Sequence, residues 1–337
     1  MLEKDVRSTL PYGRGSAVVA NAQAKMRAAR VSKRFLEFLP SLGLAAPPLG
    51  GSAISAACKR QQADGGVGRG PGGPPSSYTR LMLLCTVRDC HMALEREARR
   101  LFCPRGHSFD VARSGYINLL QPQDRRSKQP GDTAAAIAGR RRLHDGGVTG
   151  PLLRAIAATV AASPGDVVLD AGCGEGFYLG ALARETGCDA HGVDISIPAV
   201  DAAARRYPEC EWTVANADRF LPYAERSFSL VMSITARMNA GEFRRVLRED
   251  GRLLVALPAP EDLVELRGVG RDRVARTVET FEQGFTLVDQ RRVTTATELD
   301  AAAVQDVLHS IYRPLRSQPA SAMRVTFSLD LLLFRVK

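Results

Sequence analysis

The sequence predicts an α/β fold with a doubly wound, mostly parallel β-sheet, and three observations support it. An apolar run over 167–171 ends in an acid-and-glycine turn, which is typical of a buried strand that turns tightly into a helix. A second short strand ends at Asp194, eighteen residues after the last glycine of that turn. From Pro151 onward, segments of strand and helix character alternate, which indicates parallel strands joined by helices. A ligand is expected at the carboxyl ends of these strands.

The elements can be placed in chain order. Helix-forming residues flank the glycine turn and follow the second strand, so we expect helices over 152–162, 177–185 and 198–207. Apolar runs bounded by turn residues predict strands over 167–171, up to Asp194, and over 211–215, 227–234 and 252–257. The segments 285–295 and 324–336 are expected to close the sheet as an antiparallel pair. Residues 151–337 are therefore expected to form one catalytic domain.

The glycine turn is suited to a nucleotide-like ligand. Its glycines permit positive φ and let a ligand approach main-chain N–H groups that a Cβ would shield. They are Gly172, Gly174 and Gly176. Asp194 stands where an acid can accept both ribose hydroxyls. Asp170 and Glu175 would repel a pyrophosphate, but they would attract a ligand that carries ammonium and sulfonium charges.

The form D-x-G-x-G-x-G at 170–176 resembles motif I of the Rossmann-like S-adenosylmethionine methyltransferases more than the dinucleotide pattern G-x-G-x-x-G. Methyl transfer from S-adenosylmethionine is therefore favoured over hydride transfer. The glycine turn alone does not distinguish an RNA substrate from a small metabolite.

Composition and charge limit the kinds of partner that the protein is expected to bind. The 337 residues carry a formal net charge of +10, and the excess lies before residue 150: residues 1–80 hold 12 Lys and Arg against 4 Asp and Glu, and 81–150 hold 12 against 7. A basic balance suggests an acidic partner such as RNA. No run of 18 apolar residues occurs, so no membrane span is expected. Seven cysteines without a disulfide-like framework suggest a reducing compartment and a cytoplasmic protein.

The first 80 residues are poor in aromatic side chains and contain a Gly- and Pro-rich stretch at 65–75, so we expect most of them to be disordered. A helix over 20–39 is compatible with their Ala, Met, Arg and Lys content. An over-extended translation start, with Met82 as one candidate for the first residue, is the alternative interpretation.

Four side chains between 83 and 122 are suited to zinc. Two close-spaced groups are separated by twelve residues, and three thiolates with an imidazole satisfy a tetrahedral site. The candidate ligands are Cys85, Cys90, Cys103 and His107. His91 is a competing ligand beside Cys90, and buried free cysteines are the alternative. The region 83–122 is expected to be a zinc-binding knuckle.

Several motifs in one order resemble the 23S rRNA guanine-N1-methyltransferases. The resemblance covers roughly 83–337 and rests on C-P-R-G-H-S-F-D at 103–110, G-Y-I-N-L-L at 115–120, S-K-Q-P-G-D at 127–132, Arg140-Arg141 and the glycine turn. It implies a zinc-containing, S-adenosylmethionine-dependent enzyme whose partner is a hairpin of 23S rRNA, and a homodimer is a further expectation. The four ligands named above correspond to the family's metal site, although the family usually spaces the first pair as C-x2-C.

The segment 123–150 is expected to be a basic linker. It places six basic residues against the single acid Asp132 between 125 and 142. Such a patch can neutralise phosphates and position an RNA hairpin, although charge runs are often only solvated surface. The candidate RNA-binding residues are Arg125, Arg126, Lys128, Arg140 and Arg141.

The resemblance also implies cofactor contacts beyond the glycine turn. Tyr178 and Leu179 correspond to such contacts, and Asp218 is a candidate for the adenine amino group. Thr149 stands where relatives carry a cofactor-touching tyrosine. Asp262, after the last parallel strand, is a further candidate for the cofactor site and, with Glu261, for a general base.

At one turn the chain departs from the sequence pattern of the family, and this leaves alternative functions open. The family tends to an aromatic-Ala-Pro turn after the strand at 227–234, whereas this chain has Thr235-Ala236-Arg237, and it lacks the N-P-P-Y motif of enzymes that methylate exocyclic amino groups. Methylation of 23S rRNA at guanine N1 is the leading hypothesis. A small-molecule methyltransferase and a non-catalytic RNA- or ribosome-binding relative are the alternatives.

Overall fold

The computed structural model describes residues 83–124, 131–311 and 320–337. The expectations for 1–80, for a helix over 20–39 and for Met82 lie outside these residues, as do Arg125, Arg126 and Lys128.

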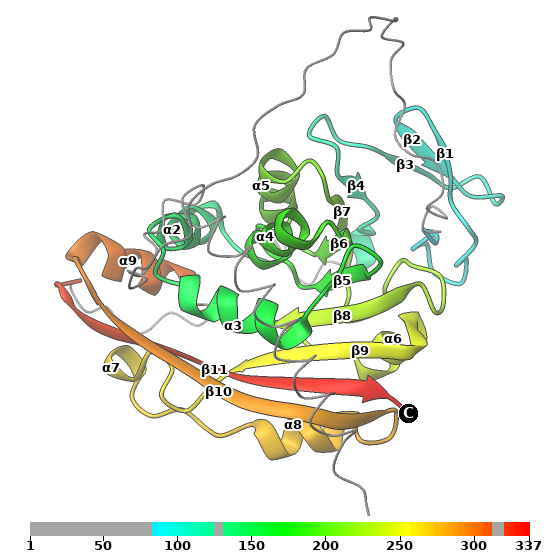
Figure 1. Ribbon diagram of the computed structural model, residues 1–337. Coiled ribbons are helices and arrows are strands. Elements are labelled where there is room, and N and C mark those ends of the chain that lie inside the picture. Colours follow the sequence, from blue (N-terminus) through cyan, green and yellow to red (C-terminus); the bar gives the residue numbers. More distant parts are fainter. Residues whose placement is uncertain (1–82, 125–130, 312–319) are drawn as a thin grey trace, which may run out of the picture.

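An eight-stranded mixed sheet forms the centre of the molecule, in the order β10-β11-β9-β8-β5-β6-β7-β4 (Figure 1). Its strands are β4 (Ile117–Asn118), β5 (Val167–Ala171), β6 (Asp189–Asp194), β7 (Glu211–Val214), β8 (Phe228–Ile234), β9 (Leu247–Pro258), β10 (Phe285–Leu299) and β11 (Met323–Val336). Strands β4 to β9 pair in parallel, β11 pairs antiparallel with β9, and β10 pairs antiparallel with β11. The doubly wound arrangement and the antiparallel closing pair are confirmed.

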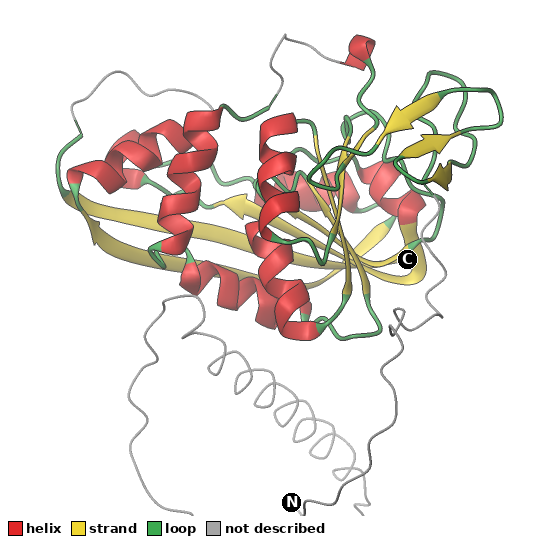
Figure 2. Cartoon of the chain, turned by 90° about the horizontal axis from the view of Figure 1, so that it is seen from above, coloured by secondary structure: helices red, strands yellow, loops and turns green. Residues whose placement is uncertain are grey.

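Helices cover both faces of this sheet, and Figure 2 shows several of them lying across it. They are α2 (Ala134–Asp145), α3 (Gly150–Val160), α4 (Phe177–Thr186), α5 (Ile197–Arg206), α6 (Ala240–Val246), α7 (Val264–Arg267), α8 (Val274–Phe281) and α9 (Ala301–Ser310), with a short 3-10 helix η2 (Pro122–Asp124). Alternate residues of the central strands face opposite cores: Val168 belongs to the core that includes residues of α3 and α4, whereas Leu169 belongs to the core that includes residues of α6 and α8. Burial on both faces explains why these strands read as continuous apolar runs.

A three-stranded antiparallel ribbon lies at one end of the sheet (Figure 1). Its strands are β1 (Glu95–Glu97), β2 (Arg100–Phe102) and β3 (Ser108–Asp110). Strand β4 follows the ribbon directly and pairs in parallel with β7. The Leu84 amide also donates to the Pro222 carbonyl at 3.0 Å. The ribbon is therefore joined to the main sheet by backbone hydrogen bonds, which places it next to the loops at the sheet's edge.

The segment expected to be a basic linker contains a helix. Helix α2 begins at the cap residue Thr133, whose hydroxyl accepts from the Ala136 amide, and it packs against α9. Arg142 on α2 donates to Asp306 on α9 at 2.6 Å and 2.8 Å. Both helices lie over one end of the sheet, so α2 forms a wall of the cavity described next.

Candidate active site and metal centre

A cavity of about 790 Å³ opens at the carboxyl ends of β5, β6 and β8. This is the edge where doubly wound sheets bind ligands, and the volume is within the usual range of about 300–1,000 Å³ for small-molecule sites. Most of the expected cofactor residues line it. They are Thr149, Asp170, Gly172, Gly174, Tyr178, Asp194, Asp218 and Asp262.

The glycines of the loop serve different purposes. Gly172 has φ +91°, and a Cβ there would lie 2.4 Å from the Ala236 Cβ of the loop after β8. Gly176 has φ +77°, but it does not line the cavity; a Cβ would meet the Trp212 ring at 2.3 Å. Gly176 is thus required for helix packing, which corrects the expectation that it contacts the cofactor.

The amides of the three glycines and of Cys173 in the loop are already bonded within the protein. The Gly172 and Cys173 amides donate to the Val193 carbonyl at 2.8 Å and 3.1 Å, and the Gly176 amide donates to Cys173. The Gly174 amide donates to Asp194 Oδ2 at 3.0 Å. The expectation that these amides are open to a ligand is therefore wrong. The loop allows close approach of a ligand, and the side chains and the Glu175 amide, which donates to no described residue, remain for its recognition.

Two buried carboxyls at the loop each have an oxygen without a hydrogen-bond partner among the described residues, although Glu175 Oε1 lies 3.7 Å from the neutral His144 ring at Nε2. Asp170 is 2% exposed and Glu175 is 3% exposed, and each has one oxygen, Oδ1 and Oε1 respectively, that accepts no hydrogen bond from described residues. Burial, together with the nearby Asp194, raises the pKa of Asp170 to about 8. Burial likewise raises the pKa of Glu175 to about 7. An unpaired buried acid is costly to the fold, so a cationic ligand is the partner that these groups fit.

Each arginine that lines the cavity is paired with an acid. Arg140 lies 2.7 Å from Asp132, Arg237 lies 3.4 Å from Asp218, and Arg267 lies 2.6 Å from Asp262. The lining acids outnumber these arginines by six to three. When these acids are ionised, their excess negative charge favours a ligand that carries sulfonium and ammonium groups. The chemistry of the cavity therefore fits S-adenosylmethionine.

Arg140 lies in a different environment from the one expected. It was a candidate for RNA phosphates, but it lines the cofactor cavity, and a Cβ on Gly174 would lie 3.3 Å from its Nη1. Its neighbour Arg141 is half exposed and lies 3.8 Å from Asp145. The structure thus separates the two adjacent arginines: Arg140 faces the cofactor cavity and Arg141 faces solvent.

Two further expectations are corrected. Leu179 is fully buried in the core and does not line the cavity. Glu261 also lies outside the lining and is ion-paired with Arg292 at 3.1 Å, so the structure places it away from the cavity. Asp262 does line the cavity, but its Oδ1 accepts from the Ser328 amide at 3.0 Å.

The position of Thr149 is explained by a histidine that sequence reasoning missed. His144 is 7% exposed, stacks on Phe177 at a centroid distance of 3.9 Å, and contacts Tyr178 edge-on at 5.8 Å. Its Nδ1 lies 2.6 Å from the Thr149 hydroxyl. Burial, with Arg140 and Arg206 nearby, lowers the pKa of His144 to about 3, so the ring is neutral. His144 and Thr149 both line the cavity beside Tyr178.

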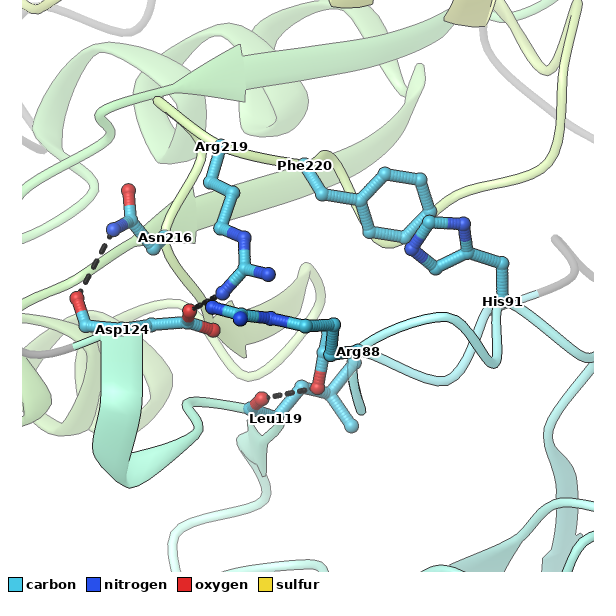
Figure 3. Close-up of a pocket in the computed structure, with 8 residues that line it drawn as sticks. Arg88, His91, Leu119, Asp124, Asn216, Arg219 and Phe220 are labelled. Carbon is cyan, nitrogen blue, oxygen red and sulfur yellow. Dashed lines mark hydrogen bonds and ion pairs between the residues drawn. The ribbon is translucent and has the colours of Figure 1, made fainter.

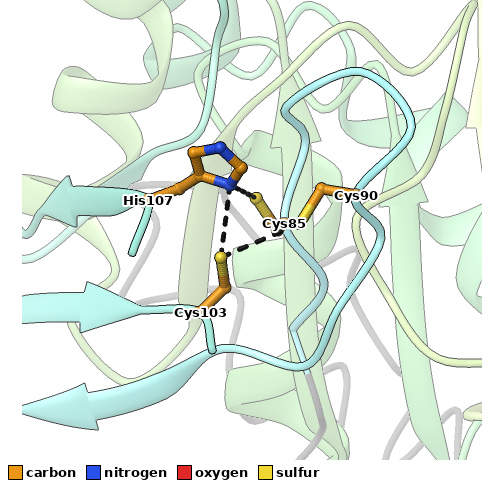
Figure 4. A group of neighbouring side chains, drawn as sticks. All are labelled: Cys85, Cys90, Cys103 and His107. Atoms are coloured by element: carbon orange, nitrogen blue, oxygen red, sulfur yellow. Dashed lines mark hydrogen bonds between the residues drawn. The ribbon is translucent and has the colours of Figure 1, made fainter. Parts of the chain in front are cut away.

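The four expected metal ligands meet at one point (Figure 4). Their ligand atoms all lie within 4.8 Å of one another. Cys90 and Cys103 sulfurs are 3.8 Å apart, and the His107 Nδ1 lies 3.4 Å from Cys85 and 3.2 Å from Cys103. Tetrahedral zinc with Zn–S of about 2.3 Å and Zn–N of about 2.05 Å requires edges of about 3.8 Å and 3.6 Å. The donor set therefore fits zinc.

The long first spacing is accommodated by the backbone. Between Cys85 and Cys90 the Cys90 amide donates to Val87, and Asp89 and His91 adopt positive φ of 59° and 47°. These left-handed residues reverse the chain, so Cys90 still reaches the centre. His91 points away and stacks on Phe220, so it is not a ligand in this structure.

Removal of one ligand is expected to unfold the ribbon. His107→Ala leaves three thiolates, and a structural zinc site needs four ligands. Because the ribbon strands are three residues long, most of their stability is expected to come from the metal. We expect the zinc content of the purified protein to fall sharply and amide exchange over 83–112 to accelerate. His91→Ala is the matched control, and loss of zinc from it would contradict this ligand assignment.

Comparison with known proteins agrees with this geometry. A family model described as a methyltransferase domain matches residues 168–255, and a zinc-ribbon model described as "RlmA, N-terminal" matches residues 84–128. The fold and the acid-lined cavity thus define a class I, S-adenosylmethionine-dependent methyltransferase domain preceded by a zinc ribbon.

Proteins of similar sequence identify the family to which this chain belongs. The 23S rRNA (guanine(748)-N(1))-methyltransferase of Streptomyces fradiae is 36% identical over 231 residues, which are 65% of this chain and 81% of that protein. Proteins named provisionally as 23S rRNA (guanine-N(1)-)-methyltransferases are 39% identical in Micromonospora griseorubida (55% of this chain, 68% of that protein) and 32% identical in Bacillus subtilis (55% and 67%). The chain belongs to the 23S rRNA (guanine-N1)-methyltransferase family.

Proposed function

We propose that this protein methylates N1 of a guanine in a hairpin of 23S rRNA, with S-adenosylmethionine as the methyl donor. The observation that carries the proposal is the cavity at the glycine loop, where unpartnered buried acids fit a cationic cofactor, next to a zinc ribbon bonded to the same sheet. Family membership supports the RNA substrate, because the Streptomyces fradiae relative is named for this reaction.

Different residues of the cavity would bind different groups of the methyl donor. S-adenosylmethionine, when bound, supplies a methyl group on a sulfonium that leaves readily. Asp170 and Glu175 offer negative charge to its ammonium and sulfonium groups, and Arg140 offers a guanidinium to its carboxylate. Asp194 at the end of β6 would hold the ribose, and Asp218 after the neighbouring β7 would hold the adenine.

The remaining task of the protein is alignment of the target base. The loop after β8 approaches the glycine loop at Gly172 and holds Thr235 at φ 52°. Arg237 on this loop lines the cavity and is exposed, and the next residue, Met238, is exposed as well. Holding base and methyl donor in line and excluding water is expected to supply much of the rate enhancement. We place the target guanine against this loop.

The RNA partner also suggests where the protein acts. No helix among the described residues is long and apolar enough to cross a membrane. We propose a cytoplasmic enzyme, since its substrate is ribosomal RNA. The expected homodimer stays a prediction.

A labelling experiment tests the function. Purified protein is incubated with tritiated S-adenosylmethionine and unmodified 23S rRNA, and the modified site is mapped by reverse-transcriptase stops, because an N1-methyl group blocks Watson–Crick pairing. We expect label in RNA and one new stop at a guanine. RNA that carries 1-methylguanosine at that position is the control and should accept no label. Label only in small molecules would favour a metabolite substrate, and RNA binding without label would favour a non-catalytic relative.

A further inference from the structure

A small hollow lies where the zinc ribbon meets the main sheet (Figure 3). Its volume is about 20 Å³. Small-molecule sites usually measure about 300–1,000 Å³, so the hollow cannot enclose such a ligand. Any partner must therefore lie across it from outside. Its walls come from the ribbon, from the end of η2 and from the loop after β7, and they include Arg88, His91, Asp124, Arg219 and Phe220.

The hollow carries an excess of positive charge. Arg219 is ion-paired with Asp124, whose side chain is 7% exposed. Figure 3 shows Arg88 alongside this pair. Arg88 is exposed, and no described acid lies within 4.0 Å of its guanidinium. Two guanidinium groups around one carboxylate leave a net charge that suits a phosphate, which guanidinium binds in a forked geometry.

A flat aromatic surface adjoins these arginines. His91 stacks on Phe220 with a centroid distance of 4.1 Å and an interplanar angle of 11°. Phe220 is held in turn by Arg245, whose guanidinium lies 4.9 Å from the ring centroid and pairs with Glu242 at 2.7 Å. His91 itself is exposed. An exposed ring on a fixed support is a surface on which an unpaired base can stack.

The hollow is close to the cofactor cavity along a single loop. Asn216, Ala217 and Asp218 line the cavity, and the next residues, Arg219 and Phe220, line the hollow. In the sequence, Asp124 is followed at once by the basic run that begins with Arg125. A chain of nucleotides with its target base at the cavity would therefore pass this surface.

We propose that the seam between ribbon and sheet binds a nucleotide flanking the target guanine, with its phosphate on Arg88 and Arg219 and its base stacked on His91. This inference rests on the proposed function, because it takes RNA as the substrate. Phosphate contacts and ring stacking are the interactions that an unpaired stretch of a hairpin offers to proteins. Through this hollow, the zinc ribbon and the catalytic domain would together position the RNA substrate.

Binding of a 23S rRNA hairpin, measured by fluorescence anisotropy over a range of salt, tests the seam in the full-length zinc-loaded protein. Arg88→Ala is expected to weaken binding and to lower the slope of log affinity against log salt by about 1. His91→Ala is expected to weaken binding by about 5- to 100-fold with little change in slope, because it removes a stacking surface. Arg96→Ala, an exposed arginine of β1, is the matched control and should bind within about twofold of wild type.

Other readouts separate this inference from the proposed function. All three variants are expected to keep the wild-type zinc content and affinity for S-adenosylhomocysteine. Wild-type hairpin binding by Arg88→Ala and His91→Ala, or equal weakening by Arg96→Ala, would overturn the seam proposal, and the proposed function would stand if the wild type still methylates RNA. If the wild type neither binds nor methylates the hairpin, both fall.

Discussion

Asp170→Asn is expected to lower the affinity for S-adenosylhomocysteine by about 10- to 100-fold, since a charge-assisted hydrogen bond contributes about 1.5–3 kcal/mol. The same change is expected to stabilise the free protein at high pH. Burial raises the pKa of Asp170 to about 8, so its favourable contribution to folding is complete below the ordinary Asp pKa and is lost as pH rises through about 8. Asparagine stays neutral, so the variant should melt at a higher temperature than wild type at pH 9, by about 2–4 °C per kcal/mol.

The pH dependence of binding follows from the same carboxyl. The ammonium group of the ligand binds the ionised form, so wild-type affinity should rise with pH from 6 to 8, by at most about tenfold per unit for this group. In Asp170→Asn the rise should be flatter, with Glu175 left to titrate near 7. Calorimetric titration with S-adenosylhomocysteine at several pH values, and thermal melts of the free protein, measure both effects.

The matched control is Asp166→Asn, at the residue that immediately precedes strand β5. Although burial opposes it, hydrogen bonds from Ser229 and Ser163 lower the pKa of Asp166, so this carboxylate stabilises the fold above its ordinary pKa. Asp166→Asn should therefore lose stability at pH 9 and keep cofactor affinity. If Asp170→Asn instead bound the ligand as tightly as wild type, its place in the cofactor site would be refuted.

Arg140→Gln is expected to weaken S-adenosylhomocysteine binding by about 10- to 100-fold and to leave 5′-methylthioadenosine binding unchanged, because the second ligand lacks the amino-acid end. The guanidinium lies beside the glycine loop, within reach of the charges of Glu175 and Asp194. The ammonium and carboxylate of an amino acid share one carbon. A ligand whose ammonium faces these acids therefore presents its carboxylate to Arg140, in place of Asp132.

Arg141→Gln is the control for Arg140→Gln, because it changes the adjacent arginine on the solvent side of α2. It should bind both ligands like wild type. Equal losses for both ligands in Arg140→Gln would indicate general damage to the cavity rather than loss of a carboxylate contact. Weakened RNA binding with unchanged cofactor affinity would restore the role that the sequence predicted for Arg140.

The local sequence pattern was sufficient to predict the strands of the sheet and the ligands of the metal site. The strands at 167–171 and up to Asp194 were placed correctly because strands buried on both faces read as apolar runs. The turn C-P-R-G-H holds Cys103 and His107 together locally, through the Gly106 residue at φ +82°. Helix α9 and the helical character of 134–145 were missed, since their stability comes from packing against each other.

The sequence alone determined the class of fold, the glycine loop with Asp170 and Asp194, and the four metal ligands, because each depends on residues close together in the chain. The tertiary structure decided which neighbours meet across elements. It buried Leu179 and packed Gly176 against Trp212, bonded the loop amides internally, and turned Arg140 toward the cofactor cavity while Arg141 faced solvent. It also brought Arg88 and His91 beside Arg219 and Phe220. The amino-acid sequence shows which charged and aromatic residues are present, but only tertiary packing determines which of their side chains remain without partners.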